Sequence, residues 1–389
     1  MKRIISLLIV ICLLTAPVGA VDTLSDDAVP IQAPSACLLE KSTGQVLYEK
    51  NAYEHRLIAS VTKVMTLLLV MEALDDGTLT PETLITASRH ASEMGGSQIW
   101  LEEGEQMTVE EMLKCVTVVS ANDCAVALAE HLAGSEEAFV QKMNDRARQL
   151  GMADTHFTDC TGLFDSPEHY SCAHDVAVMA RELISHEKIK TYSTIWMDNV
   201  RGGEFALSNT NKLIRYYPGA TGLKTGYTSA AGYCLAATAQ RDGVEYVAAV
   251  LGAETSEQRF GSARTLLDHG FANYGLCPLH PDEVLPPIPV VLGQADSVQP
   301  VYPAQEHILL EKSQLSALRY DLRLSEQVQA PVQAGDSLGV LTVYAGDTAV
   351  ADVPLVAGNS VDRMGVWDIF KVLLKILCCD GHAVPTPAE

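Results

Sequence analysis

The segment from Arg56 to Gly77, RLIASVTKVMTLLLVMEALDDG, constrains the fold more than any other part of the chain. From Ser60 to Leu74 it is apolar on nearly every helical face, and Gly77 stands where a helix would end. Such a helix has to be covered on all sides. Because 48% of the 389 residues are hydrophobic, the chain can supply that cover. We therefore expect a central buried helix that begins at Ser60.

Ser60 and Lys63 lie one turn apart at the start of this helix and share one of its faces. Burial lowers the pKa of a lysine, and a neutral lysine can take the proton of a serine hydroxyl and make it a nucleophile. Backbone N–H groups at the helix start would also face an oxyanion. The pair alone is weak evidence, since Ser185 and Lys188 repeat the spacing in a polar segment that is typical of a surface.

Two further motifs follow in order. VVSAND places Ser120 and Asn122 between two helical patterns, and TGLKTGYT places Lys224, Thr225 and Gly226 before an apolar strand. Taken singly, the first could be a helix cap and the second a turn. Together and in order, they predict an acyl-transfer site in which the charge of Lys224 favours a neutral amine on the catalytic lysine.

The rest of the first 276 residues predicts helices between two hairpins. SACLLEKSTGQVLYEKN is typical of two strands, and AAGYCLAATAQRDGVEYVAAVLGA of two more around Asp242 and Gly243. Helical patterns lie between them, one opened by Thr108 and Glu111 as a capping box. We expect an α/β fold of the α+β kind, an antiparallel sheet flanked by helices, as the catalytic domain over residues 30–276.

Three further segments are expected after this domain. Residues 277–289 are rich in proline and predict a linker, and residues 290–360 predict a small all-β, sandwich-like domain. Residues 362–379 predict an amphipathic helix that lies in a membrane interface, with Trp367 as anchor. The alternative for this last helix is docking on its own protein or on a partner.

The first twenty residues are typical of a signal peptide, with a basic start at Lys2 and Arg3, an apolar stretch and a small-residue end at Ala20. We expect the protein to be exported. Its expected location is the outer face of the cytoplasmic membrane, which borders the periplasm or the cell-wall space. A retained membrane anchor is the alternative. The formal net charge of −22 argues against nucleic acid as a partner.

Nine cysteines lie beyond the signal segment, and their spacings match no zinc pattern. Several stand inside apolar runs, which predicts reduced, buried thiols. A Cys160–Cys172 bridge is the alternative. The expected chemistry needs no metal and no organic cofactor.

The three motifs resemble those of penicillin-binding serine enzymes with a β-lactamase/transpeptidase-like fold. The wording ASVTKVMT, SANDCAVALAEH, MNDRARQLGMADTHFTDCTGL and GLKTGYTSAAGYCLAATAQRDG resembles the low-molecular-mass D-alanyl-D-alanine carboxypeptidases, peptidase family S11, class C type 5. The resemblance runs from about residue 30 to 275 and extends to the β domain, through APVQAGDSLGVLTV, and to the C-terminal helix.

The resemblance implies removal of the terminal D-alanine from peptidoglycan pentapeptides through an acyl-enzyme on Ser60, and acylation of Ser60 by β-lactams. It implies an oxyanion hole made by the N–H groups of Ser60 and Tyr227, and a carboxylate grip by Arg259. The implied catalytic residues are Ser60, Lys63 and Ser120, and the implied substrate-binding residues are Asn122, Lys224, Thr225, Gly226, Tyr227 and Arg259.

Two positions depart from the family pattern: Thr221 stands where relatives often carry Asp, and Thr210 where some place Arg. No glutamate is an obvious deacylating base, which argues against rapid β-lactam hydrolysis. A D,D-endopeptidase or weak β-lactamase on the same site remains an alternative, as does a non-catalytic cell-wall-binding protein. The expected partners are therefore peptidoglycan, β-lactams and a membrane surface.

Overall fold

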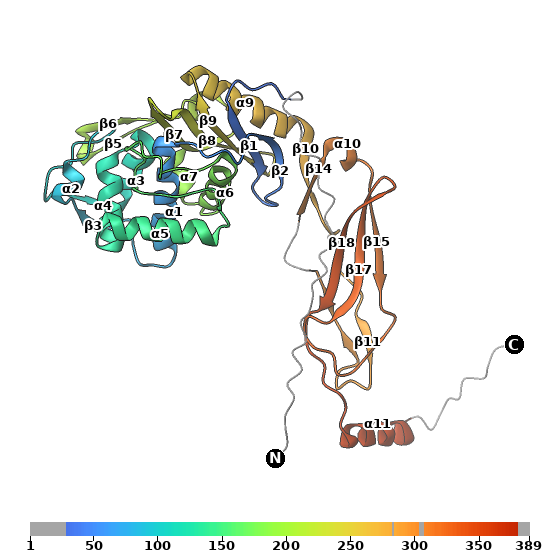
Figure 1. Ribbon diagram of the computed structural model, residues 1–389. Helices are drawn as coiled ribbons and strands as arrows, with labels where there is room; N and C mark the ends of the chain where they lie inside the picture. The colour runs from blue at the N-terminus through green and yellow to red at the C-terminus, as the bar shows by residue number, and fades with distance from the viewer. Residues whose placement is uncertain (1–28, 282–283, 303–306, 380–389) are drawn as a thin grey trace, which may run out of the picture. The chain divides into compact units, whose positions relative to one another are not determined.

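The computed structural model describes residues 29–281, 284–302 and 307–379 (Figure 1). The chain forms two compact units that divide between Leu276 and Cys277. The larger unit carries every site residue predicted above. The segment expected to be a signal peptide lies outside the described residues.

A five-stranded antiparallel sheet is the centre of the larger unit. Strand β1 pairs with β9, so the hairpin at the start of the unit joins the hairpin near its end. Strand β7 pairs with β8 and leaves its other side as a sheet edge. In sheet order the strands are β2 (Val46–Lys50), β1 (Ser35–Glu40), β9 (Val244–Ala253), β8 (Gly232–Arg241) and β7 (Ala220–Thr228).

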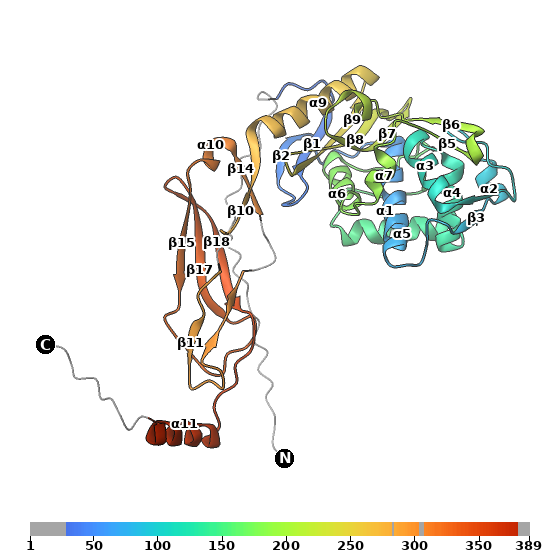
Figure 2. The same ribbon diagram turned by 180° about the vertical axis from the view of Figure 1, so that it is seen from behind.

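Helices cover both faces of this sheet, as Figures 1 and 2 show. Helix α9 (Ser256–Asn273) packs on β8 and β9 from one side, and α6 (Ala173–Leu183) packs on β1 and β9 from the other. This arrangement confirms the predicted α+β class. Shorter elements complete the unit: β3 (Leu84–Thr86), α2 (Arg89–Ser92), β4 (Gln106–Thr108), η2 (Cys115–Val119), α7 (Ile189–Ser193), β5 (Met197–Val200), η3 (Arg201–Gly203), β6 (Phe205–Ser208) and α8 (Leu213–Tyr216).

The apolar segment forms helix α1 (Lys63–Asp75), which packs against its neighbours α4, α5 and α6. Its buried residues lie around the whole circumference, as expected. The helix begins at Lys63 and not at Ser60, because residues Ala59–Thr62 form a 3₁₀ turn, η1. The surrounding helices are α3 (Val109–Lys114), α4 (Asn122–Ala133) and α5 (Glu136–Gln149).

The smaller unit is built from short β-sheets with apolar cores of their own. Its largest sheet contains the hairpin β17 and β18, whose strands pair over most of their length. Cys277 and Leu279 are buried in one of these cores. Strand β10 (Tyr274–Pro278) contains the point where the two units divide. The strands after it are β11 (Ile288–Val291), β12 (Ser297–Val298), β13 (Pro300–Val301), β14 (His307–Glu311), β15 (Leu318–Leu324), β16 (Val328–Gln329), β17 (Ser337–Ala345) and β18 (Thr348–Ala357), with a helical turn α10 (Lys312–Leu315).

The last described element is helix α11 (Val366–Cys379). Its apolar side chains are largely exposed, with Trp367 at 75% and Phe370 at 51%. Within the described ranges, no helix has the length and apolar character needed to cross a membrane.

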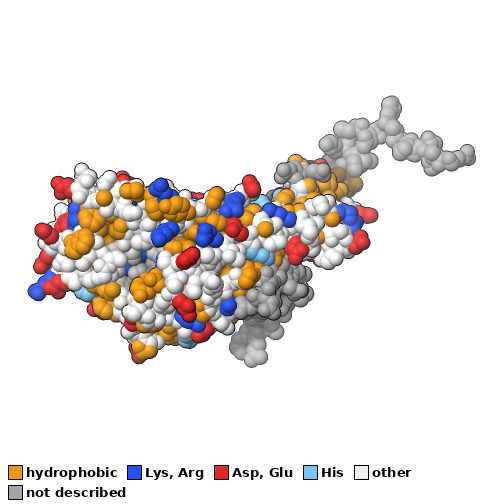
Figure 3. Space-filling view, turned by 90° about the horizontal axis from the view of Figure 1, so that it is seen from above, with side chains coloured by type: hydrophobic (Ala, Val, Ile, Leu, Met, Phe, Trp, Pro, Cys, Tyr) orange, Lys and Arg blue, Asp and Glu red, His pale blue; other side chains and the backbone are white. Residues whose placement is uncertain are grey.

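The cysteines from Cys37 to Cys277 are all buried free thiols, seven in number. Cys160 and Cys172, considered above for a bridge, are both among them. On the face seen from above, acidic side chains are scattered among basic and hydrophobic ones (Figure 3).

Candidate active site

The turn η1 brings Ser60 and Lys63 together. The amine Nζ of Lys63 lies 3.0 Å from the hydroxyl Oγ of Ser60. A 3₁₀ turn has three residues per turn, so residues three apart stand one above the other. Lys63 is fully buried, whereas Ser60 is half-buried and keeps access to solvent.

A second partner of Lys63 was not predicted from the sequence. Its amine also donates to the backbone carbonyl of Thr161, at 2.8 Å. The carboxylate of Asp159 shapes this turn by accepting from the N–H groups of Thr161 and Gly162. Gly162 has φ +67°, and a Cβ there would lie 1.9 Å from the carbonyl oxygen of Ala59. The signal in the sequence was DCTG, an Asp-x-Thr-Gly turn pattern.

Burial is the main cause of the lowered pKa of Lys63, about 8, and the negative surroundings of Asp159 and Asp123 oppose it only in part. We expected the charge of Lys224 to depress this pKa. Instead, it is the pKa of Lys224 that is lowered. Burial is the largest cause, and repulsion by the charges of Lys63 and Arg259 adds to it. The amine of Lys224 donates to the carbonyl of Thr225, at 2.8 Å.

The third motif lies on the edge strand β7 and packs directly against the Ser60 turn. A Cβ on Gly226 would lie 2.7 Å from the carbonyl oxygen of Ile58 and 3.1 Å from the backbone nitrogen of Ser60, so only glycine allows this approach. The Thr225 hydroxyl donates to that of Thr210, at 2.7 Å. Tyr227, the next residue of the strand, is 55% exposed.

The second motif begins where the π-helical turn η2 ends. Ser120 has φ 67° and ψ 29°, a left-handed conformation that is uncommon for serine. Its hydroxyl and the carboxamide oxygen of Asn122 are buried and, among the described residues, have no hydrogen-bond partner. Unpaired buried polar atoms are rare and costly, so this pair indicates atoms reserved for a ligand.

Tertiary contacts join this motif to the other two. The carboxamide nitrogen of Asn122 donates to the carbonyl of Gly95, at 2.7 Å. A Cβ on Gly96 would lie 2.8 Å from both Asn122 Nδ2 and Leu163 Cδ1, which places the Thr161 segment beside Asn122. On the other side, the N–H of Thr210 donates to the carbonyl of Val118.

Arg259, from helix α9, is buried under the third motif. Its guanidinium donates to the carbonyls of Gly226 and Cys234, both at 3.3 Å. Burial lowers its pKa to about 10. Within the described residues it has no carboxylate partner, and its Nε is buried without any hydrogen-bond partner. A buried, uncompensated guanidinium is suited to an anionic ligand.

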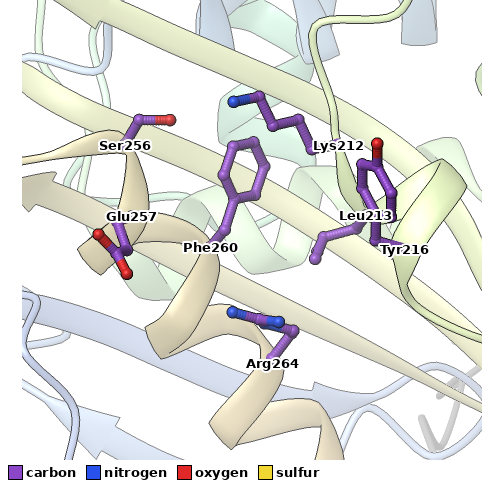
Figure 4. A pocket seen from close by; sticks show the side chains of 7 residues that line it. All are labelled: Lys212, Leu213, Tyr216, Ser256, Glu257, Phe260 and Arg264. Atoms are coloured by element: carbon purple, nitrogen blue, oxygen red, sulfur yellow. The ribbon is translucent and has the colours of Figure 1, made fainter.

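A cavity of 460 Å³ lies between α8 and the first turns of α9 (Figure 4). Phe260 stands in its middle, with Lys212 and Arg264 on opposite sides. Ser256 connects it to the site, because its hydroxyl accepts from Arg259 at 3.3 Å. None of the predicted site residues lines this cavity. Among the described residues, no group of three or more His, Cys, Asp or Glu side chains could hold a metal ion.

Residues 22–255 match the family described as D-alanyl-D-alanine carboxypeptidase, and this range contains all three motifs. The chain belongs to the D-alanyl-D-alanine carboxypeptidase family. Residues 278–363 match the C-terminal domain of penicillin-binding protein 5.

Relatives of this carboxypeptidase family match most of the chain. The D-alanyl-D-alanine carboxypeptidase DacF of Bacillus subtilis is 40% identical over 380 residues, covering 95% of this chain and 97% of its own. Penicillin-binding protein 5 of Haemophilus influenzae has a similar structure, with a TM-score of 0.75 at 28% identity, covering 86% of this chain and 98% of its own. Penicillin-binding protein D2 of Listeria monocytogenes, solved with ampicillin bound, has a TM-score of 0.57 at 31% identity, covering 62% of this chain and 98% of its own.

Proposed function

We propose that this enzyme is a serine-type D-alanyl-D-alanine carboxypeptidase that removes the terminal D-alanine of peptidoglycan pentapeptides, and that β-lactams acylate the same serine. The observation that carries the proposal is the pair of Ser60 and Lys63, with Nζ and Oγ 3.0 Å apart. The family membership supplies the substrate class.

Acylation begins when Ser60 Oγ attacks the carbonyl carbon of the penultimate D-alanine. The hydroxyl proton passes to the neutral amine of Lys63, because burial holds the pKa of that amine at about 8. The carbonyl oxygen becomes an oxyanion, and we assign its stabilisation to the backbone N–H groups of Ser60 and Tyr227. Close packing of Gly226 on the Ser60 turn supports that assignment.

The tetrahedral intermediate collapses by breaking the C–N bond to the terminal D-alanine. The leaving amine takes a proton that Lys63 releases through the hydroxyl of Ser120, which has no other partner among the described residues. Water then attacks the acyl-enzyme, Lys63 accepts its proton, and Ser60 is regenerated with the release of the tetrapeptide. Each proton taken up is returned, so the enzyme ends in its starting state.

The substrate is held by groups on either side of the reacting carbonyl. The carboxamide of Asn122 has a free oxygen for an amide N–H of the peptide. Thr225 and Arg259 bind the terminal carboxylate, with Lys224 adding positive potential. Gly226 lets the peptide backbone approach the edge of β7.

Release of D-alanine from a soluble pentapeptide tests the activity. The wild-type enzyme is expected to release it, and Ser60→Ala is expected to release none. Mass spectrometry after penicillin exposure should place a single adduct on the peptide that contains Ser60. Binding of the pentapeptide without D-alanine release would favour a non-catalytic cell-wall-binding protein and contradict the proposal.

The location of the enzyme is part of the proposal. We infer export by the segment 1–20 and attachment to the membrane surface by α11, because its exposed Trp367 and Phe370 suit a lipid interface. In this arrangement, residues 30–276 form the catalytic domain and residues 290–360 a spacer between catalysis and membrane. Cys277 and Leu279, at the start of the predicted linker 277–289, are buried in a core of the smaller unit and are part of it.

A further inference from the structure

A second surface near the proposed active site is formed by Trp100, Phe205, Arg201 and the carboxylates Glu102, Glu103 and Glu105. We name it the Trp100 surface. The indole of Trp100 is 64% exposed, and it meets the ring of Phe205 edge-on with centroids 5.9 Å apart. A hollow of 530 Å³ adjoins it, within the usual size range of small-ligand sites.

The backbone at Trp100 is strained and clamped. Trp100 has φ 56°, a left-handed conformation that is a true outlier for a bulky residue. The carboxylate of Asp123 accepts from the N–H groups of Ile99 and Leu101, at 3.0 and 3.1 Å. The guanidinium of Arg201, itself at φ 54°, donates to the carbonyls of Ile99 and Trp100. Strain that the surroundings hold in place is concentrated at functional sites.

The contacts with Asp123 and Arg201 hold the backbone of residues 99–101 so that the indole of Trp100 points outward. The same loop is hydrogen-bonded to helix α4, which carries the second motif. Asp123 directly follows Asn122, whose own N–H donates to the carbonyl of Ser97, at 2.7 Å. The loop of residues 95–101 therefore touches the second motif at one end and presents Trp100 at the other. Elements α2 and β6, which flank this surface, lie at the same end of the catalytic unit in both views (Figures 1 and 2).

The charges of the Trp100 surface select the chemistry of a ligand. Glu105 is occupied by a two-pronged ion pair with Arg201, at 2.8 and 2.9 Å. Glu102 and Glu103 are exposed and, within the described residues, have no cationic partner. They would repel an anion, but they accept hydrogen bonds from hydroxyl groups. The aromatic face offers apolar contact to the C–H face of an uncharged sugar ring.

We propose that the Trp100 surface is a sugar subsite, which stacks a pyranose of the N-acetylated glycan on the indole and binds its hydroxyls with Glu102 and Glu103. This inference rests on the proposed function, because the glycan is the carrier of the pentapeptide. The subsite contributes binding energy and touches none of the reacting atoms. It makes the enzyme prefer stems that are still attached to glycan.

Paired substrates test the subsite: the free pentapeptide, and the same peptide on its N-acetylated disaccharide. For Trp100→Ala, we expect the KM of the disaccharide-linked peptide to rise about two- to tenfold, the size of one aromatic contact, with kcat unchanged. The free peptide keeps its KM, and Trp100→Phe gives an intermediate value. Tyr53→Ala is the control. Tyr53 is also an aromatic residue, 53% exposed, and it follows β2, the sheet edge opposite to β7, so its loss should leave the KM of both substrates unchanged.

If Trp100→Ala raises the KM of both substrates equally, or of neither, the subsite proposal is wrong. A sugar titration separates this failure from failure of the proposed function. The NMR signal of the Trp100 indole N–H, assigned by its absence in Trp100→Phe, should shift with an N-acetylglucosamine oligomer that carries no peptide. Spermidine, a polycation, serves as the comparison ligand. If the indole signal does not shift with the sugar, or shifts only with spermidine, the subsite proposal is wrong, whether or not D-alanine is released.

Discussion

At the scale of single residues, the protonation state of the Lys63 amine determines the pH range in which Ser60 can react. Because the neutral amine is the base, and burial lowers its pKa to about 8, the neutral fraction grows as pH rises toward that value. We expect the rate of acylation by penicillin to rise about tenfold per pH unit well below 8 and to level off above it. Stopped-flow acylation between pH 5.5 and 9.5 measures this profile.

Lys63→Arg is the matched variant for this profile. A guanidinium stays protonated over the whole range, so acylation should fall by about 10²–10⁴-fold and lose its rise near pH 8. A wild-type profile that is flat across this range would contradict the role of Lys63 as the base.

Gly162 is the residue whose replacement should be most damaging outside the three motifs. A methyl group there would lie 1.9 Å from the carbonyl oxygen of Ala59, at a backbone φ of +67°. We expect Gly162→Ala to lower the free energy of unfolding by about 2 kcal/mol or more and to slow acylation, because the Thr161 carbonyl must move. Urea unfolding and penicillin labelling measure the two effects.

Gly261→Ala provides the control for this variant. Gly261 lies inside helix α9, where, apart from the adjoining helix backbone, no atom comes within 4 Å of the position that an alanine methyl group would take, and its φ is not positive. Alanine there should leave acylation unchanged and stabilise the fold by about 0.5–1 kcal/mol. Equal effects of the two substitutions would show that the contact with Ala59 is unimportant.

The sequence could name the reactive side chains but not all of their partners. Ser60 and Lys63 are close in the chain, so local spacing predicts their contact. The carbonyl of Thr161 is a backbone group 98 positions away from Lys63. The pattern DCTG indicates a turn there, but nothing in the local sequence shows that this turn packs against Lys63. The positive φ of Ser120 was likewise hidden, because serine rarely adopts it and tertiary contacts impose it.

At the scale of elements, strong periodicity predicted the structure well. The apolar helix α1, the hairpin of β8 and β9, and the all-β character of residues 290–360 follow from local pattern. Two details did not: the 3₁₀ turn that delays α1 to Lys63, and the π-helical turn η2. Both lie where the chain packs against distant segments, and such contacts override local preference.

Helix α11 carries the element-scale prediction. We expect Trp367→Ser combined with Phe370→Ser to reduce binding to anionic lipid vesicles by about a hundredfold or more. Each substitution removes an exposed aromatic ring, and with it the free energy gained by burying that ring in lipid. Activity on soluble pentapeptide should not change. Vesicle co-sedimentation measures binding, with Val284→Ser and Leu322→Ser as the control pair, because both side chains are exposed and lie in the smaller unit.

At the scale of the whole molecule, the division at Leu276 separates the chemistry from the β domain. Each unit has apolar cores of its own, so each can unfold as a cooperative step. The sequence indicated two domains through its change from mixed to all-β pattern. It gave no measure of how independent they are, because that depends on contacts between distant segments.

Penicillin should therefore stabilise one unfolding step and not the other. An acyl group that makes its contacts only in the folded catalytic unit shifts that unit's transition, by about 4 °C or more if these contacts add about 2 kcal/mol to the stability of a unit of this size. Calorimetry of the full chain, with and without penicillin, should show one transition move and one stay. Ser60→Ala should remove the shift, because the acyl bond cannot form. If both transitions moved together, the two units would unfold as one, and the thermodynamic independence inferred from their separate cores would be wrong.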